Sequence, residues 1–158
     1  MDFNKELFVE YKSLIKNTNI QECYQHVLKF IQYVSMELEK DLTTYSFMNR
    51  IIENKMNFTY FQMTNKKWKE MGLKLQVIFI HKTCMFEVWV SGYNKKIQND
   101  YYMNLCETKC PFEICSNPNK NDYLIKIPIS LDITIDNYKK IIFEIKSNIN
   151  KLENFFEV

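Results

Sequence analysis

The stretch LKLQVIFIHKTCMFEVWV, residues 73–90, decides the fold of this 158-residue chain. It contains two apolar runs, 73–80 and 85–90, separated by the four residues 81–84, a spacing that predicts a tight antiparallel hairpin. If Val77 pairs with Val88, the alternation of side chains along each strand places six apolar residues on one face. These are Leu75, Val77 and Phe79 on the first strand, and Phe86, Val88 and Val90 on the second.

The opposite face of the same hairpin is mixed in character. It carries Lys74, Gln76, Ile78 and Ile80 on the first strand, and Met85, Glu87, Trp89 and Ser91 on the second. Tyr60 or Gln62 can reach this face from a neighbouring strand. A face of this composition is typically covered only in part, and it offers a place where a polar or cationic small ligand could bind.

Helices and further strands flank the hairpin. Periodicity predicts helices over 2–15, 20–40, 94–107 and 137–156, a helical turn over 65–71, and strands over 57–63 and 123–127. The mixed spacing of apolar residues over 41–56 predicts irregular structure there. The order α-α-β-β-β-α-β-α predicts a single α+β domain over residues 1–158. We expect a mainly antiparallel sheet of about four strands, packed by the helices.

The composition excludes several classes of function. The two glycines, Gly72 and Gly92, stand apart, so the chain has no glycine-rich phosphate loop and no dinucleotide fingerprint. The formal net charge is +2 and the lysines are scattered among carboxylates, so nucleic-acid binding is not expected. No apolar run approaches the length of a membrane helix, and the first residues do not resemble a signal peptide, so no membrane association is expected.

Residue usage indicates a compartment and a source. The five cysteines are an odd number with irregular spacing, which indicates reduced thiols and a cytoplasmic location. One arginine stands against 20 lysines, and the chain has 17 asparagines, a bias typical of an AT-rich genome. The richness in lysine and asparagine therefore carries little information about function.

Three segments of the chain resemble a known family. They are NFTYF at 57–61, LKLQVIFIH at 73–81 and FEVWVSGYNK at 86–95. The pattern resembles an uncharacterised bacterial family of small cytoplasmic proteins, a domain of unknown function, and the likeness is most specific over the middle third of the chain. Because that family has no assigned activity, the resemblance implies a fold and a compartment and no reaction.

The order of elements between residues 20 and 127 is also that of the PD-(D/E)xK nucleases. Their chemistry needs an aspartate on the second strand and a Glu-x-Lys motif on the third, which together hold a divalent metal ion. The chain has no aspartate between Asp41 and Asp100, and Trp89 stands where a lysine should follow Glu87. The sequence therefore predicts an inactive or divergent nuclease-like fold at most.

Cysteine and histidine offer two further candidate sites. Cys106, Cys110 and Cys115 do not have the spacing of a zinc knuckle, and a fourth ligand would have to be Cys84 or His81. A nucleophilic pair of Cys84 with His81 lacks a third residue that would orient the base. We therefore predict no metal and no cofactor, and we expect His81 to be a solvent-exposed turn residue.

Two hypotheses for the function follow. The first is a small binding or protein-interaction domain without enzymatic activity, which forms a homo-oligomer, because the chain is 15% aromatic and such residues are favoured at interfaces. The second is a small-molecule enzyme in which Glu87 is the general acid or base in a pocket lined by Trp89. The candidate ligand-binding residues are Glu87, Trp89, Tyr60, Gln62 and Gln76.

Overall fold

The predicted hairpin lies at the centre of the fold. In the computed structural model, which describes residues 4–48, 50–132 and 137–158, strands β4 (Leu73–Ile80) and β5 (Met85–Gly92) are antiparallel neighbours. Their register is confirmed, since Val77 pairs with Val88. The turn between them lacks glycine, and Cys84 takes the left-handed conformation, with φ of 52°, that glycine usually supplies.

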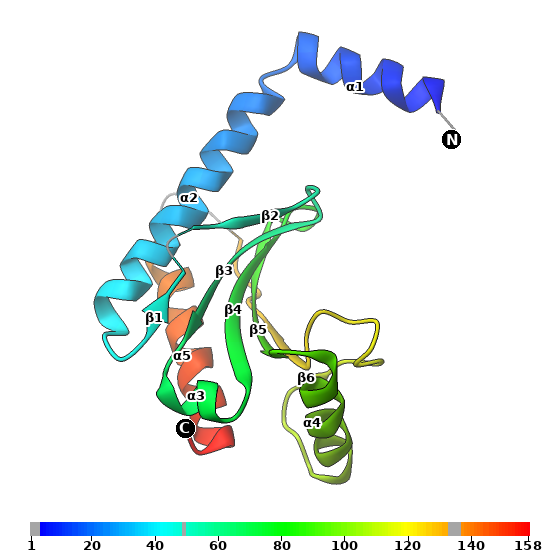
Figure 1. The fold of residues 1–158 in the computed structure, drawn as a ribbon. Helices are drawn as coiled ribbons and strands as arrows, with labels where there is room; N and C mark the ends of the chain where they lie inside the picture. The colour runs from blue at the N-terminus through cyan, green and yellow to red at the C-terminus, as the bar shows by residue number, and fades with distance from the viewer. Residues whose placement is uncertain (1–3, 49, 133–136) are drawn as a thin grey trace.

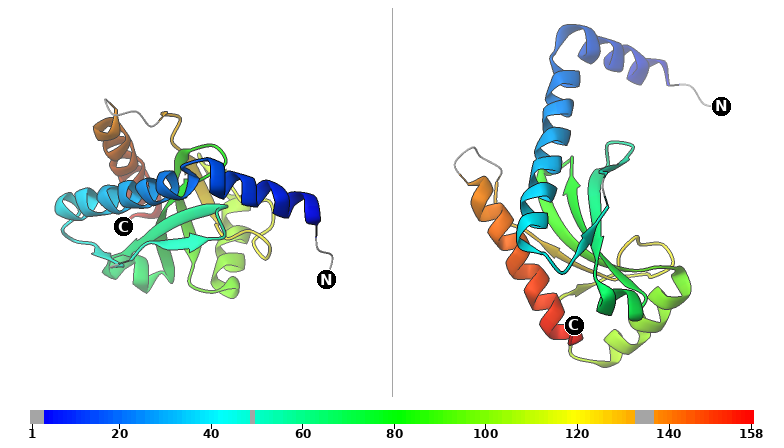
Figure 2. Two further views of the ribbon diagram at one scale, coloured as in Figure 1. Left: turned by 90° about the horizontal axis from the view of Figure 1, so that it is seen from above. Right: turned by 60° about the vertical axis from the view of Figure 1, so that its left-hand side comes forward.

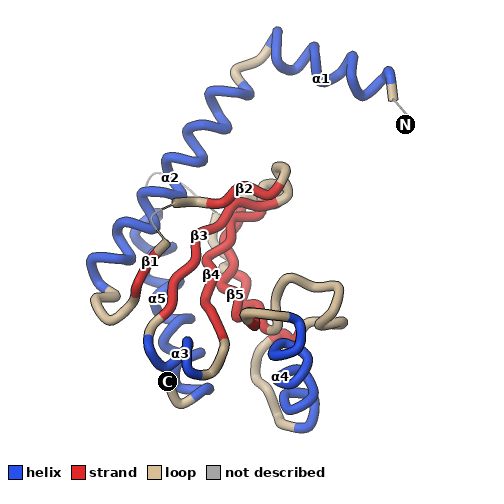
Figure 3. The backbone as a smooth tube through the Cα atoms, viewed as in Figure 1, coloured by secondary structure: helices blue, strands red, loops and turns tan. Residues whose placement is uncertain are grey.

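The sheet has seven strands in the order β1-β3-β4-β5-β7-β6, and β2 also pairs with β3 (Figure 3). Every pair of neighbours is antiparallel. The remaining strands are β1 (Ser46–Phe47), β2 (Ile52–Asn54), β3 (Phe58–Thr64), β6 (Glu113–Ile114) and β7 (Ile125–Pro128).

The predicted number of about four strands and the predicted order of elements were therefore wrong. The sequence did not reveal β1, β2 and β6, which have only two or three residues each, because so short a strand shows no alternation that could be recognised. Two of them, β1 and β2, lie within the segment 41–56 that was predicted to be irregular.

The helices are confirmed to within three residues of their predicted ends. They are α1 (Lys5–Asn17), α2 (Ile20–Asp41), α3 (Lys66–Glu70), α4 (Lys95–Glu107) and α5 (Tyr138–Phe156). The first two positions predicted for α1, residues 2 and 3, lie outside the described residues. None of the described helices combines the length and the apolar character that crossing a membrane requires.

Helices α2 and α5 cover one face of the sheet (Figures 1 and 2). Their apolar stripes meet the six inward side chains of the hairpin, all buried, and form one hydrophobic core. The stripes consist of Ile31, Val34 and Leu38 on α2, and Ile141, Ile145, Ile149 and Leu152 on α5. The opposite face of the sheet lies on the side away from these two helices.

A polar triad, with two of its three members buried, ties three distant segments together at one end of the core. Trp68 Nε1 on α3 donates a hydrogen bond of 2.9 Å to the Tyr45 hydroxyl, which donates in turn to Glu153 Oε1 on α5 at 2.6 Å. Burial raises the pKa of Tyr45, and the hydrogen bond to Glu153 raises this pKa further. The triad therefore fixes the segment that leads from α2 into the sheet.

We predict that Tyr45→Phe lowers the free energy of unfolding by about 1–3 kcal/mol, because it leaves the buried Trp68 Nε1 and the half-buried Glu153 carboxylate without their partner. The wild type should also lose stability as the pH rises above the ordinary tyrosine value of 10.0, since its folded pKa lies above that of the unfolded chain. Denaturant unfolding at pH 7 and pH 11 measures both effects.

The matched control is Tyr93→Phe, which removes the hydroxyl of an exposed tyrosine. It should unfold like the wild type at both values of the pH. Equal stability of Tyr45→Phe and Tyr93→Phe at pH 7 would contradict the role of the triad.

Candidate functional site

The face of the sheet that α2 and α5 leave uncovered contains a cavity of about 500 Å³. Side chains from strands β2 to β5 form its floor, and residues at the start of α4, together with Asp122, form its rim. The volume lies within the range of sites that bind small organic molecules. We call it the open-face cavity.

Most of the predicted site residues share this face, as expected from strand alternation. Gln76 pairs with Gln62 on one side and with Trp89 on the other, and Ile78 pairs with Tyr60 and Glu87. Tyr60, Gln76 and Trp89 line the open-face cavity, whereas Gln62 and Glu87 do not. The structure thus brings three of the five candidates into the cavity.

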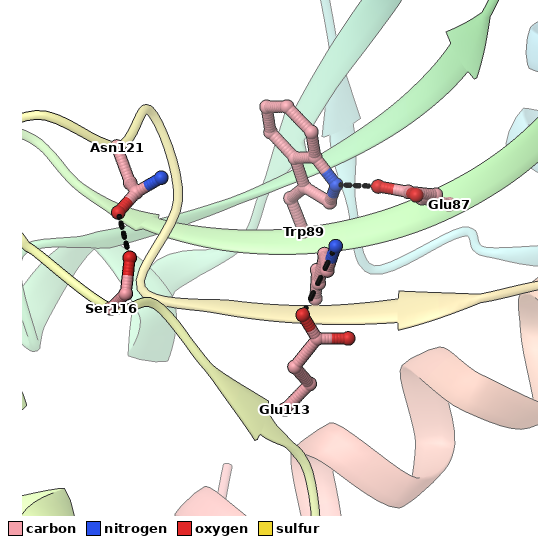
Figure 4. Close-up of polar contacts among 6 residues, drawn as sticks. Glu87, Trp89, Glu113, Ser116 and Asn121 are labelled. Carbon is pink, nitrogen blue, oxygen red and sulfur yellow. Dashed lines mark hydrogen bonds and ion pairs between the residues drawn. The ribbon is translucent and has the colours of Figure 1, made fainter.

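Glu87 contacts the indole of its neighbour on the same strand. Trp89 Nε1 donates a hydrogen bond of 2.6 Å to Glu87 Oε2, as Figure 4 shows. The Trp89 side chain is nearly buried, so this bond satisfies a donor that would otherwise be costly to bury. Glu87 therefore holds the indole in place at the edge of the cavity.

An aromatic wall forms one side of the cavity. Its members are Trp89, Phe58 and Tyr60, and the ring centroid of Phe58 lies 5.4 Å from that of Trp89 and 6.0 Å from that of Tyr60. Rings at these separations and tilts pack favourably against one another. The wall offers a rigid apolar surface to the flat part of a ligand.

Lys74 lines the cavity, although the sequence did not single it out as a ligand-binding residue. It is half-buried and has no hydrogen-bond or ion-pair partner among the residues that the structure describes. Burial lowers the pKa of its amine, and no neighbouring carboxylate opposes this shift. The floor of the cavity therefore carries a cation whose charge is not compensated.

Gln76 offers a second donor beside this lysine. The Ser91 hydroxyl donates to Gln76 Oε1 at 2.6 Å and also lies 2.8 Å from the backbone carbonyl oxygen of Asp122. This contact orients the Gln76 amide, and its Nε2 atom has no partner within the described part of the chain. Ammonium and amide donors thus point to a ligand that accepts hydrogen bonds.

The rim of the cavity is held by contacts between α4 and the loop that precedes β7. Gln98 Nε2 donates to the carbonyl oxygens of Pro118 and Asn121 at 2.8 and 3.0 Å, and Lys95 Nζ donates to the Asn121 oxygen at 2.6 Å. Gln98 is buried. Lys95 and Gln98 therefore position the rim, and both side chains already have hydrogen-bond acceptors, unlike Lys74 in the described part of the chain.

Two carboxylates also line the cavity, and neither forms an ion pair with Lys74. Glu53 on β2 accepts a hydrogen bond of 2.6 Å from the Tyr24 hydroxyl. Burial, together with this bond, raises the pKa of Tyr24. Asp122 stands exposed at the rim. The acidic groups therefore lie around the cavity without neutralising the amine on its floor.

The other candidate sites are not assembled. No three cysteine, histidine or carboxylate side chains of the described residues are grouped as metal ligands. His81 Nε2 lies 2.8 Å from Thr59 Oγ1, and the Cys84 thiol contacts the backbone oxygen of His81 instead of its ring. The expectation of a solvent-exposed His81 was wrong, since the ring is half-buried against the sheet and burial lowers its pKa.

Comparison with known proteins identifies a family and no relative of known activity. Residues 3–157 match the model of a family described as "Domain of unknown function (DUF7000)". The match confirms that the chain belongs to an uncharacterised domain family, and it covers nearly the whole chain. No curated protein and no solved structure matches the chain.

We predict that Gly92→Ala lowers the free energy of unfolding by about 1–3 kcal/mol, because a Cβ here would overpack against backbone. The added Cβ would lie 2.8 Å from the backbone nitrogen of Gln98 and 2.9 Å from the backbone oxygen of Asn94, at the start of α4. Thermal unfolding measures the loss, and Asn104→Ala at an exposed position of α4 is the control. Equal melting temperatures for the two variants would contradict this close approach.

Proposed function

The chain belongs to this family of domains of unknown function, and we propose that it is a binding domain for a small organic anion, held in the open-face cavity. The proposal retains the first hypothesis from the sequence, a binding domain without enzymatic activity. It replaces the expected polar or cationic ligand by an anion, because Lys74 lines the cavity without a partner among the described residues, whereas Glu87 lies outside the lining and Glu53 already accepts a hydrogen bond from Tyr24.

The amine of Lys74, which has no partner in the part of the chain that the structure describes, carries the proposal. Burying an ammonium group without a partner costs free energy, and here the cost appears as a pKa that burial lowers. A bound carboxylate or phosphate would supply the missing charge and recover this cost. Titratable groups that are perturbed in this way within a cavity are concentrated at functional sites.

The rest of the cavity supports an anion that also carries a flat apolar part. Gln76 Nε2 supplies a second donor for the acidic group, and the aromatic wall of Phe58, Tyr60 and Trp89 supplies an apolar surface. A few convergent polar groups beside apolar walls are the usual composition of a small-molecule site. We therefore propose an aromatic carboxylate or phosphate as the class of ligand.

The enzyme hypothesis receives less support from the geometry. The Glu87 carboxylate does not line the cavity, and it accepts a hydrogen bond from the Trp89 indole, so it positions this side chain.

Bacterial origin and a cytoplasmic location stay predictions from the sequence.

The variant Lys74→Met tests the proposal through two opposite effects. Without a ligand it should raise the melting temperature by about 2–4 °C, which corresponds to about 1 kcal/mol in a domain of this size, because it removes a buried charge. This gain in stability should shrink as the pH rises from the lowered pKa of Lys74 in the folded protein toward the ordinary value of 10.5. Above that value the wild-type amine is neutral in both the folded and the unfolded chain, so folding no longer buries a charge.

Binding is measured with benzoate, indole-3-acetate and phenyl phosphate as probes, by thermal shift and by quenching of tryptophan fluorescence. At least one probe should stabilise the wild type, and Lys74→Met should abolish that effect. The control is Lys126→Met, which removes a lysine that does not line the cavity and whose Nζ lies 3.1 Å from Glu113 Oε1. This variant should keep the binding.

Benzamide, a neutral analogue of benzoate, separates charge recognition from binding to the aromatic wall. Benzamide should bind the wild type more weakly than benzoate does. It should bind Lys74→Met as strongly as it binds the wild type. Unchanged affinity for all three anions in Lys74→Met would contradict the proposal, and so would failure of every anion to bind the wild type.

A further inference from the structure

Helix α1 extends away from the sheet and its covering helices (Figures 1 and 2). None of its 13 residues is buried. Its large apolar side chains are exposed, with exposed fractions of 62% for Leu7, 60% for Tyr11 and 45% for Leu14. Together with the half-buried Ile15 they form a stripe along one side of the helix, which we call the α1 stripe.

A helix of this kind gains little stability within its own chain. Isolated helices shorter than about 12–15 residues are marginal in water, and most helices in proteins are stabilised by packing an apolar face. An exposed apolar surface of this kind marks an interaction site. The α1 stripe therefore needs a partner surface, and the charges beside it indicate which one.

The two edges of the α1 stripe carry opposite charge. At 3.6 residues per turn, Glu10 and Lys12 lie on opposite sides of Tyr11, each about 100° around the helix from it. Glu6 lies on the same side as Glu10, and Lys16 on the same side as Lys12. One edge of the stripe is thus acidic and the other basic.

This arrangement does not stabilise the helix itself. Glu6 and Glu10 are four residues apart, as are Lys12 and Lys16, and like charges at this spacing destabilise an isolated helix. The helix dipole favours Glu6 in the first turn and Lys16 in the last, but it does not account for the opposed edges at Glu10 and Lys12. The opposite charges of the two edges are therefore suited to pairing with another helix.

We propose that α1 pairs with α1 of a second copy of the chain, in parallel and in register, through the α1 stripe. In a parallel twofold pair, each acidic edge lies beside the basic edge of the other helix, so Glu10 of one copy meets Lys12 of the other. In an antiparallel pair the equivalent edges would meet, and Glu10 would lie beside Glu10. Charge complementarity thus selects the parallel arrangement.

Size and charge agree with a second copy as the partner. A 13-residue helix is about 20 Å long, so the pair lies at the low end of specific interfaces and we expect micromolar affinity. A helix that lies on an anionic membrane usually has a polar face rich in lysine and arginine. In α1, by contrast, three lysines are offset by two glutamates, which favours pairing with another helix.

Sedimentation equilibrium of the full chain across the micromolar range tests the pairing. The wild type should dimerise, and Tyr11→Asp in the centre of the α1 stripe should weaken dimerisation at least tenfold. The matched control is Val9→Asp, at an exposed position on the opposite side of the same helix, and it should dimerise like the wild type. A monomeric wild type, or equal weakening by both variants, would overturn the proposal.

A charge exchange tests the parallel arrangement. Glu10→Lys and Lys12→Glu should each weaken dimerisation several-fold, and the double variant should restore it. Each single variant also turns a like-charged pair within the helix, with Glu6 or Lys16, into an opposite-charged one, so helix content in circular dichroism should not fall. Failure of the double variant to recover dimerisation would overturn the proposal.

Vesicles provide the remaining arm of the test. The wild type is mixed with vesicles of phosphatidylcholine and phosphatidylserine and sedimented. The proposal predicts that the chain stays in the supernatant. Pelleting that Tyr11→Asp abolishes and Val9→Asp retains would overturn it in favour of a membrane surface as the occupant of the stripe.

Discussion

The pairing of β4 with β5 is the constraint on which the rest of the structure depends. Because side chains alternate along a strand, the register that turns Val77 and Val88 toward α2 and α5 must turn Gln76 and Trp89 the other way. A slip of one residue would exchange the two faces and bury Lys74 in the core. The hydrophobic effect on one face thus fixes which groups line the cavity on the other.

The core also explains how the fold tolerates an unfavourable group. Lys74 lies on the same strand as Leu75 and Val77, both of which are buried, so the strand stays in place although the Lys74 amine lacks a partner among residues 4–48, 50–132 and 137–158. Local destabilisation of this kind is common at functional sites and is offset elsewhere in the fold. The buried face supplies stability, and the open face presents the chemistry.

The sequence was sufficient to predict what depends on long regular patterns. The two apolar runs and the four residues between them revealed the register of β4 and β5, and helical periodicity over about 20 residues revealed α2 and α5. The predictions that failed concern features that depend on contacts between distant segments. Strands of two or three residues arise where a loop happens to meet a neighbour, and the burial of His81 depends on its contact with Thr59. Whether Lys74 finds a partner depends on where distant carboxylates lie, and of those in the cavity Glu53 accepts a hydrogen bond from Tyr24, which no local pattern reveals.

The most direct measurement of the central claim is the titration of the Lys74 amine itself. Carbon-13 NMR of lysine side chains, assigned with Lys74→Met, follows its pKa in the free protein and with saturating indole-3-acetate. We predict a pKa below the ordinary lysine value of 10.5 in the free protein, and a rise toward or above that value when the anion binds. An ordinary pKa that the anion leaves unchanged would contradict the account.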